Sequence, residues 1–544
     1  MYWLLPTAVV QIVALFHSPS VAAQIQLPIY AHLSESTVLE AESSQNEFLS
    51  NISGLSGRAY YIPINLGTPG QQLNLLLDTG SSDTAVASKS LQHVNRWFDP
   101  SASSTVLCSD LIQSVQYHVG SWRGYLCSDQ LSFPNARGVA NRTNVQTSLK
   151  IDFAIIDEAH DFFLPNNASG WEGIVGLGFP ALSVPPVKPS DSTSKIPTSR
   201  LSYLALNLFP TVSRPLGLFD SLVQQWGLPD VFSLLLCGLT HQNFRKSTGE
   251  RRMNGIFVAG GTKLEVSNHK QEPILYTPIR KAWYYEIVLT DLLIDNESII
   301  NDCKELNFDK TIVDSGTTNI YFPPRAHALL VTRIVTYFSR RTQAISFDPT
   351  SNFWQGRTMF CKQATDGQLG GTTGLPYTLF PPIELRMVSQ SSGFTSINQV
   401  LAVTLSPQQY IRYTGRFARG DQQQDCFAFA IQRGSFGTIL GATFIEGFFT
   451  IFDRSSLRVG LSNSTCNRYT NVSTVPQSQV NGFVPWNPTD QRAVPMDCAF
   501  HRPEPITWMK SFELTTTIIT MGSIFLTIIT VPTICILNCI SPLK

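Results

Sequence analysis

Two short stretches, one in each half of the 544-residue chain, combine residue types that could activate a water molecule. Residues 75–82 read Leu-Leu-Leu-Asp-Thr-Gly-Ser-Ser, and residues 311–318 read Thr-Ile-Val-Asp-Ser-Gly-Thr-Thr. In each stretch an apolar run ends in a carboxylate, Asp78 or Asp314, followed by a hydroxyl residue, a glycine and another hydroxyl residue. A carboxylate at the end of a buried strand is costly unless it is hydrogen-bonded. The hydroxyls can donate to it, and glycine lets the backbone come close.

Two such loops could bring their carboxylates face to face. Close like charges do not both ionise easily, so the pair would share one proton and its pKa values would split. One carboxylate could then accept a proton from water while the other polarises a carbonyl group. A single copy is a weak signal because these are common turn residues. The repetition continues, however, since an apolar pair and a glycine follow each loop at residues 173–176 and 438–441. This favours one ancestral lobe used twice.

Composition narrows the class of protein. Charged residues make up 14% of the chain, and Lys+Arg and Asp+Glu number 39 each. A nucleic-acid binder would carry a basic excess, so nucleic acid is not an expected partner. The length suffices for two or more hydrophobic cores. A hydrophobic content of 43% with 33 prolines fits a mostly β protein with many turns.

Longer strings resemble a known family. The two aspartate loops resemble those of pepsin-like aspartic proteases, and further strings resemble the membrane-anchored branch, the β-secretases or memapsins. These strings lie at residues 276–280, 283–286, 302–305, 407–410 and 447–454. The resemblance runs from about Gly57 to about Cys498. It implies a mostly β, bilobal pepsin-like aspartic protease fold with two pseudo-symmetric β lobes, to which the C-terminus adds an expected transmembrane helix.

The resemblance also implies roles for individual residues. Asp78 and Asp314 are the expected catalytic pair, with Ser81 and Thr317 donating to their outer oxygens. Thr79 and Ser315 are expected to brace the loops against each other. An extended peptide would bind as an added strand does. The residues expected to line or cover its binding cleft are Gly80, Tyr117, His118, Trp122, Gly316, Thr318 and Asn319. No cofactor is expected, and no Cys-x-x-Cys pair or histidine cluster predicts a metal site.

Residues 115–122 are typical of a hairpin tip. By resemblance this is the flap that closes over the substrate, with Tyr117 as the flap tyrosine and Trp122 as its support. The alternative is two aromatic residues on an ordinary hairpin. His118 departs from the small hydroxyl residue usual in the family. We expect it to be exposed, where it could alter the pH dependence near the substrate.

The N-terminal half divides into three regions. Residues 1–23, with an apolar run and small residues at 21–23, predict a signal peptide, the alternative being an N-terminal anchor. Residues 24–57 contain no Lys or Arg, and we expect a poorly ordered propeptide-like segment there. It lacks the basic residue with which family propeptides often oppose the aspartates. Residues 58–240 form the expected N-terminal catalytic lobe, in which the Pro- and Ser-rich stretch 185–215 reads as a surface insertion.

The C-terminal half carries the second lobe and the expected anchor. Residues 241–498 form the C-terminal catalytic lobe, with the lobe boundary near 238–254. Within the two lobes, helices are expected at 218–226 and 329–337, and a buried strand at 232–236. Behind a stem at 499–513, residues 514–537 are free of charge and would span about 36 Å as a helix, enough to cross a lipid bilayer. The alternative is a buried core helix.

These features predict a single-pass type I membrane protein with its catalytic part luminal or extracellular. The secretory pathway, an endosome or the cell surface would be its location. Residues 538–544 form a short cytosolic tail without an acidic dileucine sorting signal. Cys535 and Cys539, at the far end of the membrane run, are palmitoylation candidates, although cysteines there are often unmodified.

Cysteines and sequons fit an oxidising compartment. Eight cysteines precede the membrane run and could pair in 105 ways. The resemblance implies three disulfides: Cys237–Cys466, Cys303–Cys498 and Cys361–Cys426. The remaining two, Cys108 and Cys127, flank the predicted hairpin, whose strands could bring them together in a fourth. Sequons, which also occur by chance, open at Asn51, Asn141, Asn167, Asn296, Asn463 and Asn471.

Together these observations predict a membrane-anchored aspartic endopeptidase, β-secretase-like, that acts on protein or peptide substrates, including single-pass membrane proteins. One alternative is an anchored digestive or lysosomal protease of broad, pepsin- or cathepsin-like specificity. Another is an inactive binding protein on the same scaffold, which the intact aspartates and glycines disfavour.

Overall fold

The computed structural model describes most of both predicted lobes. The described residues are 24–32, 59–134, 137–139, 148–164, 169–188, 214–237, 255–262, 272–342, 348–363, 377–391, 394–419, 422–435, 437–464, 466, 477–487 and 494–500. The predicted signal peptide, the lobe boundary, residues 189–213 of the insertion, most of the stem, the membrane run with its two cysteines and the tail lie outside them. Across the described ranges, no helix has both the length and the apolar character needed to cross a bilayer.

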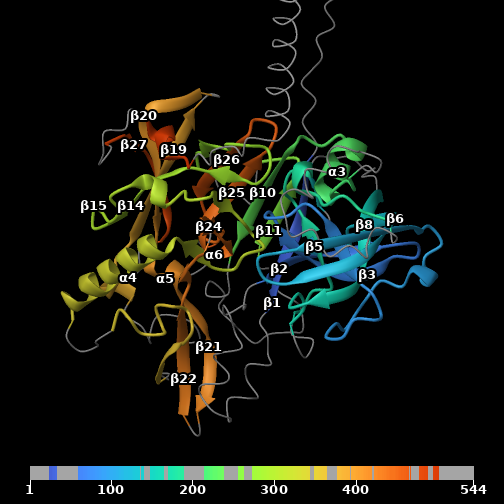
Figure 1. Ribbon diagram of the computed structural model, residues 1–544, viewed down its shortest axis with the longest axis horizontal. Helices are drawn as coiled ribbons and strands as arrows, with labels where there is room; N and C mark the ends of the chain where they lie inside the picture. Colours follow the sequence, from blue (N-terminus) through green and yellow to red (C-terminus); the bar gives the residue numbers. More distant parts are fainter. Residues whose placement is uncertain are drawn as a thin grey trace, which may run out of the picture. The chain divides into compact units, whose positions relative to one another are not determined.

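The N-terminal lobe is built of strands (Figure 1), whose buried residues pack in the main core and in a second, smaller cluster around Trp122 and Trp171. Its strands are β2 (Ala59–Leu66), β3 (Gln71–Asp78), β4 (Thr84–Ala87), β5 (Leu107–Gln116), β6 (Ser121–Ser132), β7 (Arg137–Val139), β8 (Leu149–His160) and β9 (Gly173–Gly176). Strand β3 runs parallel to β9, with Asp78 opposite Gly176. Strand β4 lies antiparallel to β9 and parallel to β8.

The C-terminal lobe repeats this connectivity. Its strands are β13 (Glu286–Ile287), β14 (Leu289–Ile294), β15 (Glu297–Ser298), β16 (Thr311–Val313), β17 (Ile320–Phe322), β18 (Phe360–Gln363), β19 (Ile383–Ser391), β20 (Phe394–Leu405), β21 (Ile411–Arg419), β22 (Gln422–Phe429), β23 (Ile431–Arg433), β24 (Thr438–Leu440) and β27 (Gln479–Pro485). Strand β16 runs parallel to β24, which is antiparallel to β17, which is parallel to β23. The order β3, β9, β4, β8 thus has its counterpart in β16, β24, β17, β23.

A run of paired strands joins the two lobes. It consists of β1 (Gln24–His32), β11 (Gly255–Ala259), β10 (Val231–Leu236), β25 (Phe448–Asp453), β26 (Arg458–Asn463) and β12 (Leu275–Pro278). The prediction that residues 24–57 are poorly ordered is wrong for β1, which pairs with β11, β2 and β7. Ile25, Leu27 and Ile29 alternate along β1 and are buried, so this strand gains enough apolar contact to be held in the sheet.

The helices are few among the described residues. They are α3 (Leu218–Trp226), α4 (Pro324–Ser339), α5 (Pro407–Tyr410) and α6 (Ala442–Ile445), with 3-10 turns η2 (Pro100–Ala102), η4 (Pro180–Leu182), η6 (Cys303–Glu305), η7 (Tyr377–Leu379) and η9 (Pro495–Cys498). Helix α3 has the predicted bounds, and it ends where Gly227 adopts a left-handed conformation. Helix α4 is longer than predicted because Pro324 is suited to the first helical position.

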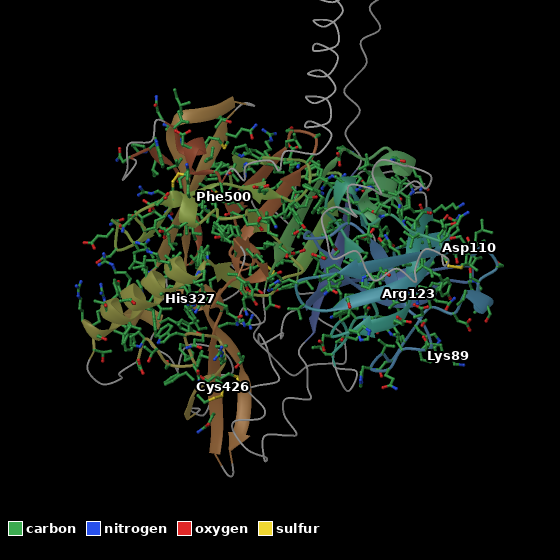
Figure 2. The ribbon with its side chains drawn as sticks, viewed as in Figure 1. Lys89, Asp110, Arg123, His327, Cys426 and Phe500 are labelled. Atoms are coloured by element: carbon green, nitrogen blue, oxygen red, sulfur yellow. A yellow bond between two sulfur atoms is a disulfide. The ribbon has the colours of Figure 1, made fainter. Side chains whose placement is uncertain are left out.

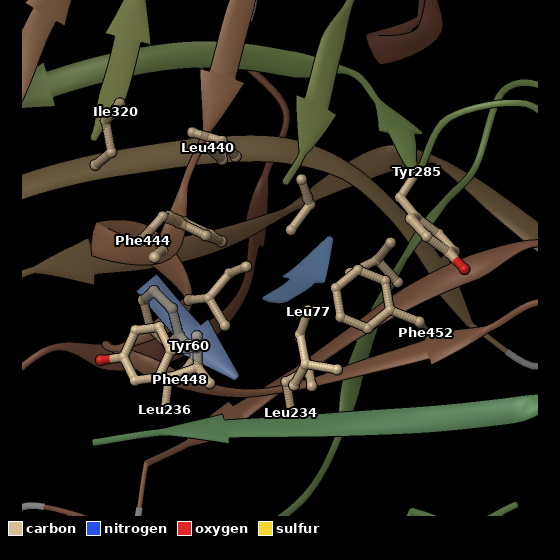
Figure 3. Packing of buried hydrophobic residues seen from close by; sticks show 14 of the residues in the cluster. Tyr60, Leu77, Leu234, Leu236, Tyr285, Ile320, Leu440, Phe444, Phe448 and Phe452 are labelled. Atoms are coloured by element: carbon tan, nitrogen blue, oxygen red, sulfur yellow. The ribbon is translucent and has the colours of Figure 1, made fainter. Parts of the chain in front are cut away.

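A continuous apolar core lies beneath the ends of β3 and β16. Figure 3 shows Leu77, at the end of β3, among Tyr285, Leu234 and Phe452. The rings of Tyr285 and Phe452 meet edge to face with centroids 4.6 Å apart. Because these residues come from both halves of the sequence, the core fixes the two aspartate-bearing strands relative to each other.

All four expected disulfides are present. They are Cys108–Cys127, Cys237–Cys466, Cys303–Cys498 and Cys361–Cys426. The first joins directly opposed residues of β5 and β6, at the base of the predicted flap hairpin. The last joins β18 to β22, near the label Cys426 in Figure 2.

Candidate active site

The two aspartates are held by matching sets of donors. Asp78 is the last residue of β3, and its Oδ1 accepts from the Gly80 N–H at 2.8 Å. The Ser81 hydroxyl donates to Asp78 Oδ2. Asp314 directly follows β16, and its Oδ1 accepts from the Gly316 N–H at 2.9 Å. The Thr317 hydroxyl donates to Asp314 Oδ2 at 2.6 Å. Each carboxyl therefore has one backbone donor and one hydroxyl donor.

Thr79 and Ser315 cross-link the two loops. The Thr79 N–H donates to Ser315 Oγ at 3.1 Å, and the Ser315 N–H donates to Thr79 Oγ1 at 2.9 Å. Each hydroxyl also donates to a carbonyl oxygen of the opposite strand, Thr79 to Val313 at 3.0 Å and Ser315 to Leu77 at 2.8 Å. Both residues are buried, so these bonds fix the separation of the loops where water cannot compete.

Each loop glycine faces the carboxyl of the other loop. A Cβ atom on Gly80 would lie 2.7 Å from the carboxyl atoms of Asp314, and one on Gly316 would lie 2.3 Å from Asp78 Oδ1. Both contacts are closer than real Cβ atoms tolerate. The reciprocal contacts show that the two carboxyl groups lie together, and that only glycine fits beside them.

The environment of the pair favours a shared proton. Burial raises the pKa of Asp78 well above its usual range, and the negative charge of Asp314 raises it further. The Ser81 and Gly80 donors oppose this effect without cancelling it. Asp78 is thus suited to hold the proton that the pair shares.

The β5–β6 hairpin places an aromatic residue at the pair. Its tip is closed by the Tyr117 N–H donating to the Gly120 carbonyl oxygen at 3.0 Å. The Trp122 indole donates to the Tyr117 hydroxyl at 2.9 Å, and the ring of Tyr117 stacks on Phe162 with centroids 5.7 Å apart. Burial, and then the charge of Asp78, raise the pKa of Tyr117 well above its usual range.

The residues expected to line or cover the cleft differ in exposure, and Gly316 is exposed. His118 is exposed on the hairpin tip, as expected. Trp122 is 2% exposed, so it supports Tyr117 and does not present a surface to a ligand. Asn319 is also 2% exposed, and its place along the cleft stays a prediction.

A buried carboxyl near the pair was missed by the sequence analysis. Asp83 follows Asp78 by five residues and is 3% exposed. The signal was available, since Asp83 is a charged residue directly before the apolar run of β4. At the corresponding place after Asp314 stands the neutral Asn319. Among the described residues, no three His, Cys, Asp or Glu side chains converge as a metal site would require.

Paired carboxyl groups on two duplicated, cross-linked lobes define an aspartic-type endopeptidase site. Comparison with known proteins leads to the same class, because the eukaryotic aspartyl protease family matches residues 59–198 and 247–464. The chain belongs to that family.

Named relatives cover most of the chain. A β-secretase of Strongylocentrotus purpuratus is 32% identical over 431 residues, which span 78% of this chain and 69% of that protein. Cathepsin D of Mus musculus is 24% identical over 418 residues, or 74% of this chain and 80% of its own length. Vacuolar protease A of Arthroderma otae is 24% identical over 305 residues, which span 55% of this chain and 62% of that protein.

Proposed function

We propose that this aspartic protease is a membrane-anchored, β-secretase-like endopeptidase in which Asp78 and Asp314 jointly activate a water molecule. The observation that carries the catalytic part is the reciprocal placement of the loops, in which each glycine faces the opposite carboxyl. That placement leaves both carboxyl groups within reach of one small molecule between them.

In the proposed reaction the two aspartates have different roles. Asp314 accepts a proton from the water as its oxygen attacks the scissile carbonyl carbon. Asp78, whose pKa is raised, donates its proton toward the carbonyl oxygen. The tetrahedral intermediate then collapses as a proton passes to the leaving amine. No covalent bond forms between enzyme and substrate, in contrast to serine and cysteine peptidases.

The substrate is proposed to be an extended peptide lying between the loops and the hairpin tip. The exposed Gly316 and the backbone around it leave room for a peptide main chain, which would bind as an added strand does. Tyr117 would cover the peptide from the hairpin side. His118 would project toward solvent at the edge of that cover.

Membrane anchoring is proposed from the charge-free run at residues 514–537 and from the similarity to a β-secretase. An anchored enzyme meets bonds of single-pass proteins close to the bilayer. The similarity to cathepsin D supports a second candidate, a protease of broad specificity in an acidic compartment.

Cleavage by the full-length chain distinguishes these candidates. The substrate is a single-pass membrane protein, tested beside a soluble copy of its ectodomain and denatured haemoglobin, at pH 4.5 and pH 6. We expect the tethered substrate to be cut at few sites and faster than its soluble copy. Deleting residues 514–544 should abolish that preference. Equal cleavage of all three substrates would support the broad-specificity protease, and Asp78→Asn serves as the inactive control.

Two described sequons differ in their availability for glycosylation. Asn296 is exposed at the β14–β15 turn, where Asp295 and Asn296 have φ of 56° and 62°. Asn463 is half-buried, and its Oδ1 accepts from the Val480 N–H at 2.7 Å. We therefore propose that Asn296 carries a glycan and Asn463 does not. Asn296→Gln should remove one glycan from the mass of the mature chain, whereas Asn463→Gln should remove none.

A further inference from the structure

An open pocket of about 440 Å³ lies where the segment after β9 meets the segment between β12 and β13. The proposed reaction uses none of its side chains. Two of the lining residues are cationic and none is acidic, so the pocket presents positive charge to a ligand. The lining consists of Pro180, Ala181, Arg214, Lys281, Ala282 and Trp283.

One carbonyl oxygen organises the charged part of this pocket. The Ala181 carbonyl oxygen accepts from Trp283 Nε1 at 3.0 Å and from Arg214 Nη1 at 2.5 Å. Lys281 Nζ lies 4.1 Å from the centroid of the Trp283 ring. A carbonyl group and an aromatic ring orient a cation without cancelling its charge. The guanidinium of Arg214 and the ammonium of Lys281 therefore stay positive beside the same indole.

The acidic groups nearby leave this charge in place. Glu286, on β13, is paired with Arg280, with 2.6 Å between Oε1 and Nη1. Asp83 interacts with Arg214 through charge. Burial raises the pKa of Asp83 to about 6, so its carboxyl is mostly protonated at pH 5. In mildly acidic solution the pocket thus offers two positive charges.

A short series of contacts connects the pocket to the catalytic pair. The Leu177 N–H donates to the backbone carbonyl oxygen of Asp78 at 2.7 Å, and the Phe179 N–H donates to that of Trp283 at 3.4 Å. From Leu177 to Ala181 the chain can span at most about 14 Å. An extended peptide covers this distance in about four residues, at roughly 3.3 Å per residue. A peptide bound at the pair can therefore reach the pocket.

We propose that Arg214 and Lys281 select an acidic side chain of the peptide substrate, about three to five residues from the bond that is cut. This proposal rests on the proposed function, because it takes the peptide to be bound at Asp78 and Asp314. The substrate carboxylate would pair with both cations, and the Trp283 ring would cover its apolar stem. Single exposed ion pairs contribute little, so two of them should change kcat/KM about 3- to 10-fold.

The test uses the full-length protein and peptides that share one cleavable bond. Each peptide carries Glu or Gln at one position on either side of that bond. At pH 5 a glutamate side chain is mostly ionised. We expect KM to be about 3- to 10-fold lower for Glu than for Gln at one position, with kcat unchanged, because the contact is remote from the reacting atoms. At pH 3.5 the peptide carboxyl is mostly protonated, and the preference should disappear.

Variants of the two cations assign the preference to the pocket. Arg214→Gln and Lys281→Gln should each reduce the preference for Glu, and the double variant should remove it. Lys281→Arg should keep it, because the positive charge remains. The matched control is Lys150→Gln, which replaces an exposed lysine of β8 and should leave the preference unchanged.

Binding to the inactive variant Asp78→Asn provides a readout that does not depend on cleavage. Fluorescence anisotropy of labelled Glu and Gln peptides should show the same preference, and adding Arg214→Gln and Lys281→Gln should abolish it. Equal KM and equal binding for Glu and Gln at every position would overturn the proposal, as would a preference kept by the double variant. Cleavage retained by Asp78→Asn would instead refute the catalytic pair, and the binding comparison would still decide the role of the pocket.

Discussion

The two aspartate loops share a hydrogen-bond pattern and differ in what covers them. Each carboxyl accepts from the glycine two residues on and from the hydroxyl three residues on. Tyr117 and the buried Asp83 lie over the first loop only, whereas Asn319 follows the second. The shared pattern fixes the geometry of the pair, and the difference gives the two loops unlike surroundings.

This asymmetry matters because two equivalent carboxyls would have no preferred site for the shared proton. Burial raises the pKa of Asp78 in addition to the effect of the Asp314 charge. Duplication therefore supplies the position of the acids, and the burial of Asp78 favours a proton there.

The largest effect is expected where the loops touch. Gly80→Ala and Gly316→Ala each place a methyl group against the opposite carboxyl, at 2.7 Å and 2.3 Å. A displacement of about 1 Å at reacting groups costs on the order of 10²-fold, so kcat/KM should fall by at least that much in both. The control is Gly434→Ala, whose Cβ would have its nearest neighbour at 3.4 Å, an ordinary contact. A large loss in only one of the two variants would break the proposed equivalence of the loops.

A second prediction concerns the pH dependence of the free energy of unfolding. A buried aspartate in the N-terminal lobe and a buried histidine in the C-terminal lobe should contribute to it with opposite signs. Asp83 has a pKa of about 6 in the folded protein and of 3.8 in the unfolded chain. Its contribution to the free energy of unfolding is therefore complete below pH 3.8 and is lost as the pH rises toward 6. The loss amounts to about 3 kcal/mol. Urea unfolding at pH 4 and pH 7 should show Asp83→Asn gaining that much relative to the wild type at the higher pH.

The opposite sign is expected for His327, buried in the C-terminal lobe and labelled in Figure 2. Burial lowers its pKa, so its contribution is present above pH 6.5 and is lost as pH falls through the lower folded value. His327→Gln should therefore gain stability relative to the wild type on acidification. If the stabilities of Asp83→Asn and His327→Gln relative to the wild type changed in the same direction with pH, the opposite signs assigned to these two residues would be wrong.

A smaller effect is expected from the cross-link between the loops. Thr79→Val keeps the shape of the side chain but leaves the Ser315 N–H and the Val313 carbonyl oxygen without their partner. An unsatisfied buried group costs about 1–3 kcal/mol, which should appear as a lower urea midpoint. Thr450→Val is the matched control, because its buried hydroxyl has no partner among the described residues. Equal stabilities of the two variants would contradict the role of Thr79 as a brace.

Local patterns were enough to predict much of the fold. The apolar runs before each aspartate predicted β3 and β16, helical spacing predicted α3 with its bounds, and the hairpin of Tyr117 was expected from residues 115–122. The two lobes and three of the disulfide pairings were predicted from the resemblance, because the spacing of eight cysteines does not determine how they pair. The fourth disulfide was predicted from the hairpin that Cys108 and Cys127 flank.

The remaining features depend on partners distant in sequence. Strand β1 was missed because the acidic residues after it dominated the composition, although Ile25, Leu27 and Ile29 alternate. The burial of Asp83 was missed because its hydrogen-bond donors, Gln113, Ser183 and Val184, lie 30 to 101 residues away.

The most direct test of joint catalysis compares Asp78→Asn, Asp314→Asn and the double variant in single-turnover cleavage of one peptide. If the carboxyls act as a unit on one water, each single variant should lose on the order of 10³-fold or more, and the double variant should lose little further. Losses that add in the double variant, or a single variant that retains near wild-type rates, would contradict the shared-water mechanism.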